Sequence, residues 1–106
     1  MKFKDNPYYN PEKCGLEIFE QVDTGGHYEY DMLVIWRKLD DFTLWYDTDA
    51  GCSCPTPFDD YRHDLKPITK DTLYGFNQAL ENHTDISREH INKIYNNVKQ
   101  FLIINE

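Results

Sequence analysis

Residues 27–38 constrain the fold more than any other part of the chain. One set of alternating side chains is almost entirely large and apolar: Tyr28, Tyr30, Met32, Val34 and Trp36. The other set is polar at both ends and apolar in the middle: Glu29, Asp31, Leu33, Ile35 and Arg37. Because successive side chains of a strand point to opposite faces, this pattern predicts a long strand. At its centre the strand is either covered on both faces or is the central strand of a sheet.

Two shorter strands are predicted beside it. Residues 15–22 place Leu16, Ile18 and Val22 on one side, and a Gly-Gly hairpin turn at residues 23–26 follows. Residues 42–47 are rich in aromatic and β-branched side chains, as strands prefer. The connections are short, so the sequence predicts a three-stranded antiparallel meander over residues 15–48, after an irregular segment over residues 1–14.

Helices are predicted after the strands. Thr56 and Pro57 favour the start of a short helix within a Cys/Pro-rich acidic segment, residues 49–68. Residues 69–82 indicate a second helix. Thr84 and Asp85 offer an N-cap for a third, whose apolar stripe is Ile91, Ile94, Tyr95, Val98, Phe101 and Leu102. The expected fold is one α+β domain in which the short helix and two C-terminal helices follow the meander, with the C-terminal helices packed on the sheet.

Negative charge is concentrated in one segment. The chain carries a net charge of −8, and residues 40–64 hold seven Asp against one Arg, which accounts for −6 of it. Such a field repels nucleic acid and favours a basic partner or a cation. The predicted partner-binding residues are therefore Asp40, Asp41, Asp47, Asp49, Asp59, Asp60, Asp64 and Tyr61. A solvated acidic surface without a partner explains the same residues, since Asp is common in loops.

Enzyme motifs are not found in the sequence. It contains no nucleophile motif, and Gly25-Gly26 precedes a predicted strand rather than the helix N-terminus that a phosphate-binding loop requires. No apolar run approaches the ~20 residues of a membrane span. Three cysteines, an odd number, argue against a secreted disulfide framework. We therefore expect a cytoplasmic binding protein with no catalytic residues and no membrane or nucleic-acid partner.

A zinc site is the main alternative. Cys52, Cys54 and His63 could supply ligands, completed by Cys14 or His27. The spacing of Cys52 and Cys54 lacks the two-residue gap common in zinc knuckles, and two small buried residues in a tight turn explain them as well. Apart from this zinc ion, no cofactor is expected. A third hypothesis, sequestration of a small signalling ligand, requires Arg37, Lys38 and Arg62 to converge.

The phrase Gly51-Cys52-Ser53-Cys54-Pro55-Thr56-Pro57-Phe58-Asp59-Asp60-Tyr61, together with Tyr9-Asn10-Pro11-Glu12-Lys13, Gly15-Leu16-Glu17 and Trp36, resembles a family of small uncharacterised bacteriophage proteins. The resemblance covers about the first 65 residues and does not extend to the last helix. It implies no known activity and no catalytic residue. It implies a phage-encoded protein in a bacterial host cytoplasm. Small acidic phage proteins of this kind resemble inhibitors of the anti-CRISPR or anti-restriction type, which occupy a basic groove on a host defence nuclease.

Overall fold

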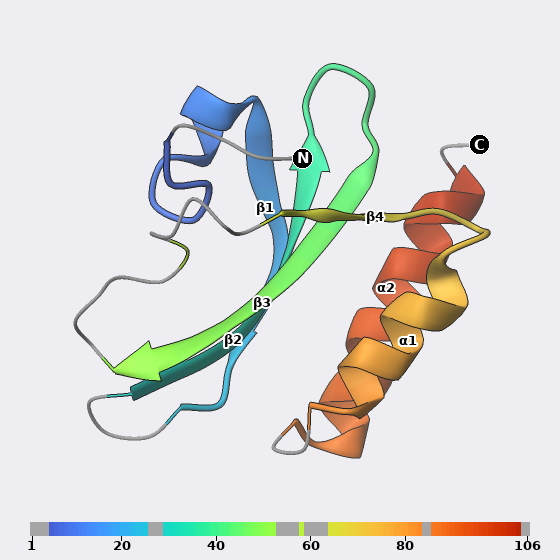
Figure 1. The fold of residues 1–106 in the computed structure, drawn as a ribbon. Coiled ribbons are helices and arrows are strands. Elements are labelled where there is room, and N and C mark those ends of the chain that lie inside the picture. Colours follow the sequence, from blue (N-terminus) through green and yellow to red (C-terminus); the bar gives the residue numbers. More distant parts are fainter. Residues whose placement is uncertain (1–4, 26–28, 53–57, 59–63, 84–85, 105–106) are drawn as a thin grey trace. The chain divides into compact units, whose positions relative to one another are not determined.

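A computed structural model describes residues 5–25, 29–52, 58, 64–83 and 86–104 (Figure 1). The chain divides into two compact units, Met1–Pro67 and Ile68–Glu106. The elements, in order, are a 3-10 helix η1 (Pro11–Cys14), strands β1 (Leu16–Asp23), β2 (Glu29–Lys38), β3 (Leu44–Cys52) and β4 (Lys66–Ile68), and helices α1 (Leu73–Glu81) and α2 (Arg88–Ile104). The boundary between the units lies next to the predicted start of the helical part at residue 69.

The sheet has four strands in the order β1-β2-β3-β4 and is antiparallel. The α+β class is confirmed, but the prediction of three strands is wrong by the short strand β4. Pro67 in this strand is typical of a residue that ends a helix, because proline lacks a backbone N–H. The same property is tolerated at a sheet edge, where one side of the strand has no neighbouring strand to receive a hydrogen bond.

Strand β2 lies between β1 and β3, which is one of the two arrangements that its pattern allowed. All of residues 32–36 are buried. Tyr30, Met32, Val34 and Trp36, on one face of this strand, belong to a hydrophobic core of unit 1. The other buried residues of this core are Leu16, Phe58 and Leu65. The indole Nε1 of Trp36 donates a hydrogen bond of 2.9 Å to the carbonyl oxygen of Pro7, so the one polar atom of this buried side chain is satisfied.

Strand β1 differs from the prediction because it contains a register shift. Ile18 pairs with Trp36, but Glu20 pairs with Ile35, so Phe19 is an extra residue in β1. A bulge of this kind exchanges the faces of all later side chains. Val22 therefore pairs with Leu33 on the face opposite to that of Ile18. The expectation that Leu16, Ile18 and Val22 share a face is wrong for Val22.

Strand β3 is longer than predicted and starts later. Phe42 belongs to the turn before it, and the strand continues through Asp49, Ala50 and Gly51 to Cys52. These later residues have low β-propensity, which is why the sequence does not indicate a strand there. Pairing with β2, in which Cys52 lies opposite Glu29, supplies the stabilisation that local preference does not.

Phe58 contradicts the predicted short helix at one point. Its φ of +61° lies in the left-handed region, so no right-handed helix passes through it. Its ring is buried and lies edge-on to the ring of Trp36, with 5.3 Å between centroids. Asp64 and Leu65, at the end of the predicted helix, are described and are not helical, whereas residues 56–57 and 59–63 lie outside the described residues.

Unit 2 contains the two predicted C-terminal helices. Helix α1 begins at Leu73 rather than at residue 69, because Thr69 and Thr72 form a turn in which Thr72 Oγ1 accepts the backbone N–H of Thr69 at 2.8 Å. Helix α2 is capped by Ser87, whose Oγ accepts the N–H of His90 at 3.2 Å, rather than by the predicted Thr84 and Asp85, which lie outside the described residues.

The apolar stripe of α2 is confirmed at its centre, where Ile91, Ile94 and Val98 are buried. An ion pair of 3.0 Å between Arg88 and Glu81 joins the start of α2 to the end of α1. The packing of the two helices on the sheet, and their membership of a single domain with it, stay predictions.

Two glycines allow a matched test of the turn between β1 and β2. A Cβ atom on Gly25 would lie 2.6 Å from the carbonyl oxygen of Glu29 and from Cα of Tyr30, whereas one on Gly75 in α1 would meet nothing within 4 Å. We expect Gly25→Ala to lower the free energy of unfolding by about 1–3 kcal/mol. Gly75→Ala should raise it by about 0.5–1 kcal/mol, because alanine loses less backbone entropy in a helix. Urea denaturation measures both, and a stabilising Gly25→Ala would contradict the turn geometry.

Candidate functional site

The structure divides the predicted acidic residues into three groups. Asp40, Asp41 and Asp64 are exposed. Asp47 is only 5% exposed, and Asp49 is half-buried. Asp59 and Asp60 lie outside the described residues, as do Tyr61, Cys54 and His63. Cys52 ends strand β3, and its side chain lies outside the described residues too. The burial of Asp47 removes it from any partner-binding surface, which corrects its place in the predicted set.

Asp47 is buried because its side chain points to the core face of β3. It pairs with Val34 and Asp49 pairs with Met32, so both follow the parity of the buried face. Asp47 Oδ1 accepts the N–H of Thr48 at 2.8 Å and lies 3.3 Å from Nζ of Lys66 in β4. The carboxylate therefore links the neighbouring strands β3 and β4, which is a structural role.

Asp49 organises the same face of β3. Its Oδ2 accepts the backbone N–H of Phe58 at 2.8 Å and the hydroxyl of Tyr30 at 3.2 Å. The first bond fixes a residue of the Cys/Pro-rich segment against the sheet. Since the second bond comes from the neighbouring strand, Asp49 joins three segments of unit 1. Its carboxylate serves this role rather than a surface role.

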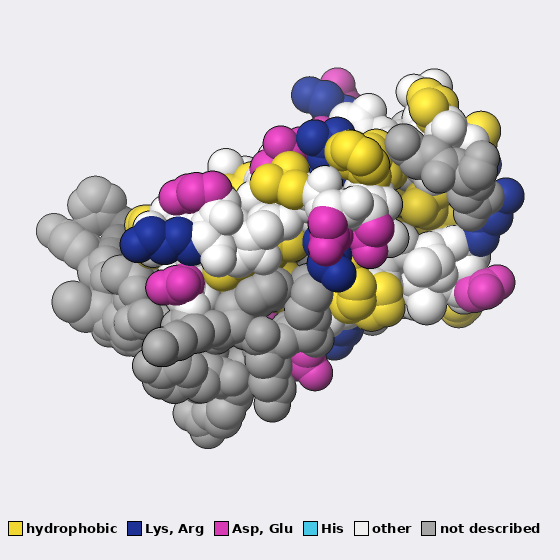
Figure 2. Space-filling model, turned by 90° about the horizontal axis from the view of Figure 1, so that it is seen from above, with side chains coloured by type: hydrophobic (Ala, Val, Ile, Leu, Met, Phe, Trp, Pro, Cys, Tyr) yellow, Lys and Arg dark blue, Asp and Glu magenta, His cyan; other side chains and the backbone are white. Residues whose placement is uncertain are grey.

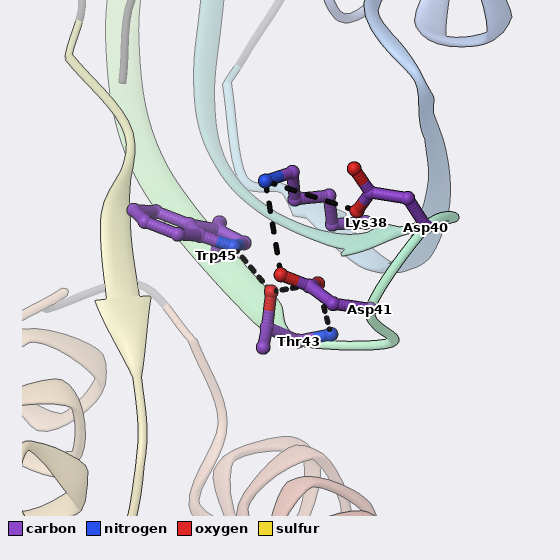
Figure 3. A network of polar contacts seen from close by, with 5 residues as sticks. All are labelled: Lys38, Asp40, Asp41, Thr43 and Trp45. Atoms are coloured by element: carbon purple, nitrogen blue, oxygen red, sulfur yellow. Dashed lines mark hydrogen bonds and ion pairs between the residues drawn. The ribbon is translucent and has the colours of Figure 1, made fainter.

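The exposed acids Asp40 and Asp41 lie in the turn between β2 and β3, residues 39–43, which we call the β2–β3 turn (Figure 3). Backbone hydrogen bonds of 2.8 Å fix this turn: Lys38 N–H donates to Thr43 O, and Phe42 N–H donates to Lys38 O. A third bond of 2.8 Å, from Leu39 N–H to Gly15 O, ties it to the residue that precedes β1. The turn is thus held at both ends and from the side.

The side chains of the turn form a polar network (Figure 3). Asp41 Oδ1 accepts the hydroxyl of Thr43 at 2.6 Å and its N–H at 3.1 Å, and Thr43 Oγ1 accepts the indole N–H of Trp45 at 2.8 Å. Nζ of Lys38 lies 3.7 Å from a carboxylate oxygen of Asp40 and of Asp41. Hydrogen bonds from Thr43, with a smaller contribution from the charge of Lys38, lower the pKa of Asp41.

Two large apolar side chains are also exposed in this turn. Leu39 is 41% exposed and Phe42 is 49% exposed. Phe42 has a φ of +59°, a left-handed conformation that costs a non-glycine residue roughly 1–2 kcal/mol. The guanidinium carbon of Arg37 lies 5.1 Å from the centroid of its ring, and Arg37 is in turn paired with Glu17 of β1. The sequence did not predict this feature, because Phe42 was assigned to the third strand.

Charge is mixed on the face of the molecule that Figure 2 shows. Figure 2 shows one face of the molecule, on which Asp and Glu side chains lie among Lys, Arg and hydrophobic side chains rather than in one block. Arg37 and Lys38 are engaged by Glu17 and by the acids of the turn, respectively. This engagement disfavours the ligand-sequestering hypothesis, which needs both cations to face a ligand. Its third cation, Arg62, lies outside the described residues.

The zinc hypothesis stays a prediction, because Cys52, Cys54 and His63 are not described at the side-chain level. Among the residues that are described, no group of three or more His, Cys, Asp or Glu side chains is arranged to hold a metal ion. Cys14 is half-buried, and its thiol lies 3.6 Å from the carbonyl oxygen of Asp5. Burial raises the pKa of the Cys14 thiol. None of the described helices is long and apolar enough to cross a membrane.

A stability comparison separates the structural aspartate from the exposed one. Asp49→Ala should lower the free energy of unfolding by about 1–3 kcal/mol, because it leaves the N–H of Phe58 and the hydroxyl of Tyr30 without this acceptor. Asp40→Ala should change it by less than about 0.5 kcal/mol, because an exposed ion pair contributes little. Chemical denaturation of both variants measures the difference. A loss for Asp49→Ala as small as the one expected for Asp40→Ala would show that Asp49 has no structural role.

The polar network predicts that the indole N–H of Trp45 responds to the titration of Asp41. The folded-state pKa of Asp41 lies below that of the unfolded chain, so its ionised form stabilises the fold at neutral pH. That stabilisation is lost as the pH falls through the folded-state pKa. In an NMR titration, the indole N–H signal of Trp45 should move together with the carboxyl signal of Asp41, since both groups bind Thr43.

The variant Thr43→Val is the control for this titration. It removes the hydroxyl but keeps the backbone N–H, so the pKa of Asp41 should rise part of the way to its ordinary value. The signal of Trp45 should then no longer follow the titration. An unchanged titration in Thr43→Val would refute the network.

Comparison with known proteins gives one match. Neither the curated proteins nor the solved structures contain a match to this chain. A family model described as a domain of unknown function, DUF7574, matches residues 5–103. The match spans both units and agrees with the expectation of an uncharacterised family. The chain therefore belongs to the DUF7574 family.

Proposed function

We propose that this protein is a non-enzymatic binding protein, encoded by a bacteriophage, that inhibits a defence system of the host by occupying a basic groove on one of its proteins. Its place of action would be the cytoplasm of the bacterial host. The observation that carries the proposal is the β2–β3 turn, in which exposed acidic and apolar side chains are presented on a rigid hairpin. The resemblance to small phage proteins supports the source and the class of target.

The turn has both the negative charge that speeds association with a basic partner and the apolar surface that gives affinity for it. The side chain of Asp40 is 74% exposed, and the chain as a whole carries a net charge of −8. Long-range attraction between opposite charges raises the association rate, while buried apolar contacts carry most of the affinity. Leu39 and Phe42 supply exposed apolar area within the same turn. A basic groove with an apolar floor is the complementary surface.

Two of the predicted acidic residues, Asp47 and Asp49, are left out of the proposed binding surface. Asp40, Asp41 and Asp64 are exposed, and Asp59, Asp60 and Tyr61 remain in the proposed set as sequence predictions. Asp47 is excluded by its burial. Asp49 is excluded by its role as acceptor for Phe58 and Tyr30. The proposed surface is therefore smaller than the acidic segment from which it was inferred.

A pull-down from lysate of a bacterial host tests this function. We expect the wild type to retain a basic host protein at low salt and to lose it at high salt, because screening weakens contacts between exposed charges. The triple variant Asp40→Asn/Asp59→Asn/Asp60→Asn should bind it about tenfold more weakly. A triple variant with the same change of charge elsewhere, Glu12→Gln/Asp71→Asn/Glu89→Gln, is the matched control and should bind as the wild type does.

Two results would contradict the proposal. In the first, the wild type retains no host protein. In the second, both triple variants bind a host protein equally well and the binding does not change with salt, which would assign the negative charge of residues 40–64 to solvation alone.

A further inference from the structure

We propose that Phe42 is the residue by which the β2–β3 turn anchors to its partner, and that the partner presents an apolar cavity bordered by arginine or lysine side chains. This inference rests on the proposed binding function and assigns the position and the chemistry of the contact. Its starting point is the exposure of Phe42 and Leu39 in one short turn. Of the two, the aromatic residue is the better anchor, since aromatic side chains are enriched at interface centres.

The backbone of Phe42 adopts a conformation that does not favour a residue with a large side chain. A φ of +59° is an outlier for a bulky residue, whereas glycine or asparagine adopts it readily. A residue kept at a sterically unfavourable position indicates a use for its side chain, and such positions cluster at functional sites. Phe42 is 49% exposed, so about half of its surface is left for contact with a partner.

Arg37 holds the ring in place without covering it. Its guanidinium carbon lies 5.1 Å from the centroid of the Phe42 ring, within the range of a cation–π contact. Glu17 pairs with the same guanidinium from strand β1, which restricts its movement. A ring that is positioned before binding loses less side-chain entropy on docking. Arg37 is therefore a positioning residue for Phe42.

The negative charge of the turn is complementary to positive charge around the partner's cavity. Thr43 binds the carboxylate of Asp41, whereas the side chain of Asp40 is 74% exposed and forms a loose ion pair of 3.7 Å with Lys38. A cation on the partner can pair with Asp40 beside the docked ring. Since like charges across an interface are disfavoured, an acidic rim would be rejected. The partner is thus a protein surface with a cationic rim around an apolar cavity.

Asparagine at position 42 separates binding from stability. Because asparagine tolerates a positive φ, Phe42→Asn should keep the melting temperature of the wild type or raise it, despite the loss of the contact with Arg37. A host protein retained in the pull-down should bind this variant about 30-fold more weakly, as expected for an anchor residue. A large fall in melting temperature would show that the ring is structural, and equal binding would show that it is not the anchor.

Small peptides test the chemistry of the contact without a known partner. We would titrate the isotope-labelled protein with the dipeptide N-acetyl-Trp-Arg-amide, and with N-acetyl-Trp-Glu-amide as the charge-reversed control. The NMR signals of residues 39–43 should shift with the arginine peptide, at an apparent affinity about fivefold above that of the control. These shifts should disappear in Phe42→Asn. Shifts that arise elsewhere, or that are equal for both peptides, would overturn the inference.

The two experiments distinguish failure of the inference from failure of the function. A host protein that binds the wild type and Phe42→Asn equally leaves the binding function standing and refutes the anchor. Peptide shifts at the turn without any retained host protein support the assigned site and refute the proposed function.

Discussion

The structure of unit 1 depends on the packing of the buried side chain of Trp36 in its core. Its strand lies at the centre of the sheet, where it pairs with Ile18 on one side and with Trp45 on the other. The ring contacts Phe58, and the indole N–H donates to Pro7. A single side chain therefore connects the N-terminal segment, the three long strands and a residue of the Cys/Pro-rich segment. Removing so large a buried side chain from any sheet leaves a cavity that its neighbours cannot fill.

The same pairing decides what the acidic residues can do. Trp45, Asp47 and Asp49 share one face of β3, because side chains two residues apart point the same way. Once Trp45 lies opposite Trp36, the two aspartates are directed toward the core face, where they bind Lys66, Phe58 and Tyr30. The turn that precedes them is directed to solvent instead. The acidic segment is thus partly a set of internal hydrogen-bond acceptors, and Asp40 and Asp41 in the turn are exposed instead.

Much of the fold was predictable from periodicity, and less of the site was. The alternation along β2 and the stripe of α2 predicted buried faces that the structure confirms, because each pattern is long and local. The bulge at Phe19, the strand β4 and the continuation of β3 through Gly51 were not predictable, because each depends on a partner strand. At the site, the exposed acids of the turn were foreseen. The exposure of Phe42 was not, since its aromatic character favours a strand and its positive φ leaves no trace in the sequence.

The sequence by itself determined the α+β class, the burial of the middle of β2, and the concentration of negative charge in residues 40–64. These properties follow from composition and from patterns within a single element. Only the tertiary structure decided that Asp47 and Asp49 are internal, that Val22 changes faces, and that Phe42 stands out of the turn above Arg37. The first two depend on the register between strands, because a shift of one residue in register exchanges the two faces of a strand. The position of Phe42 depends on the positive φ that the turn imposes on it.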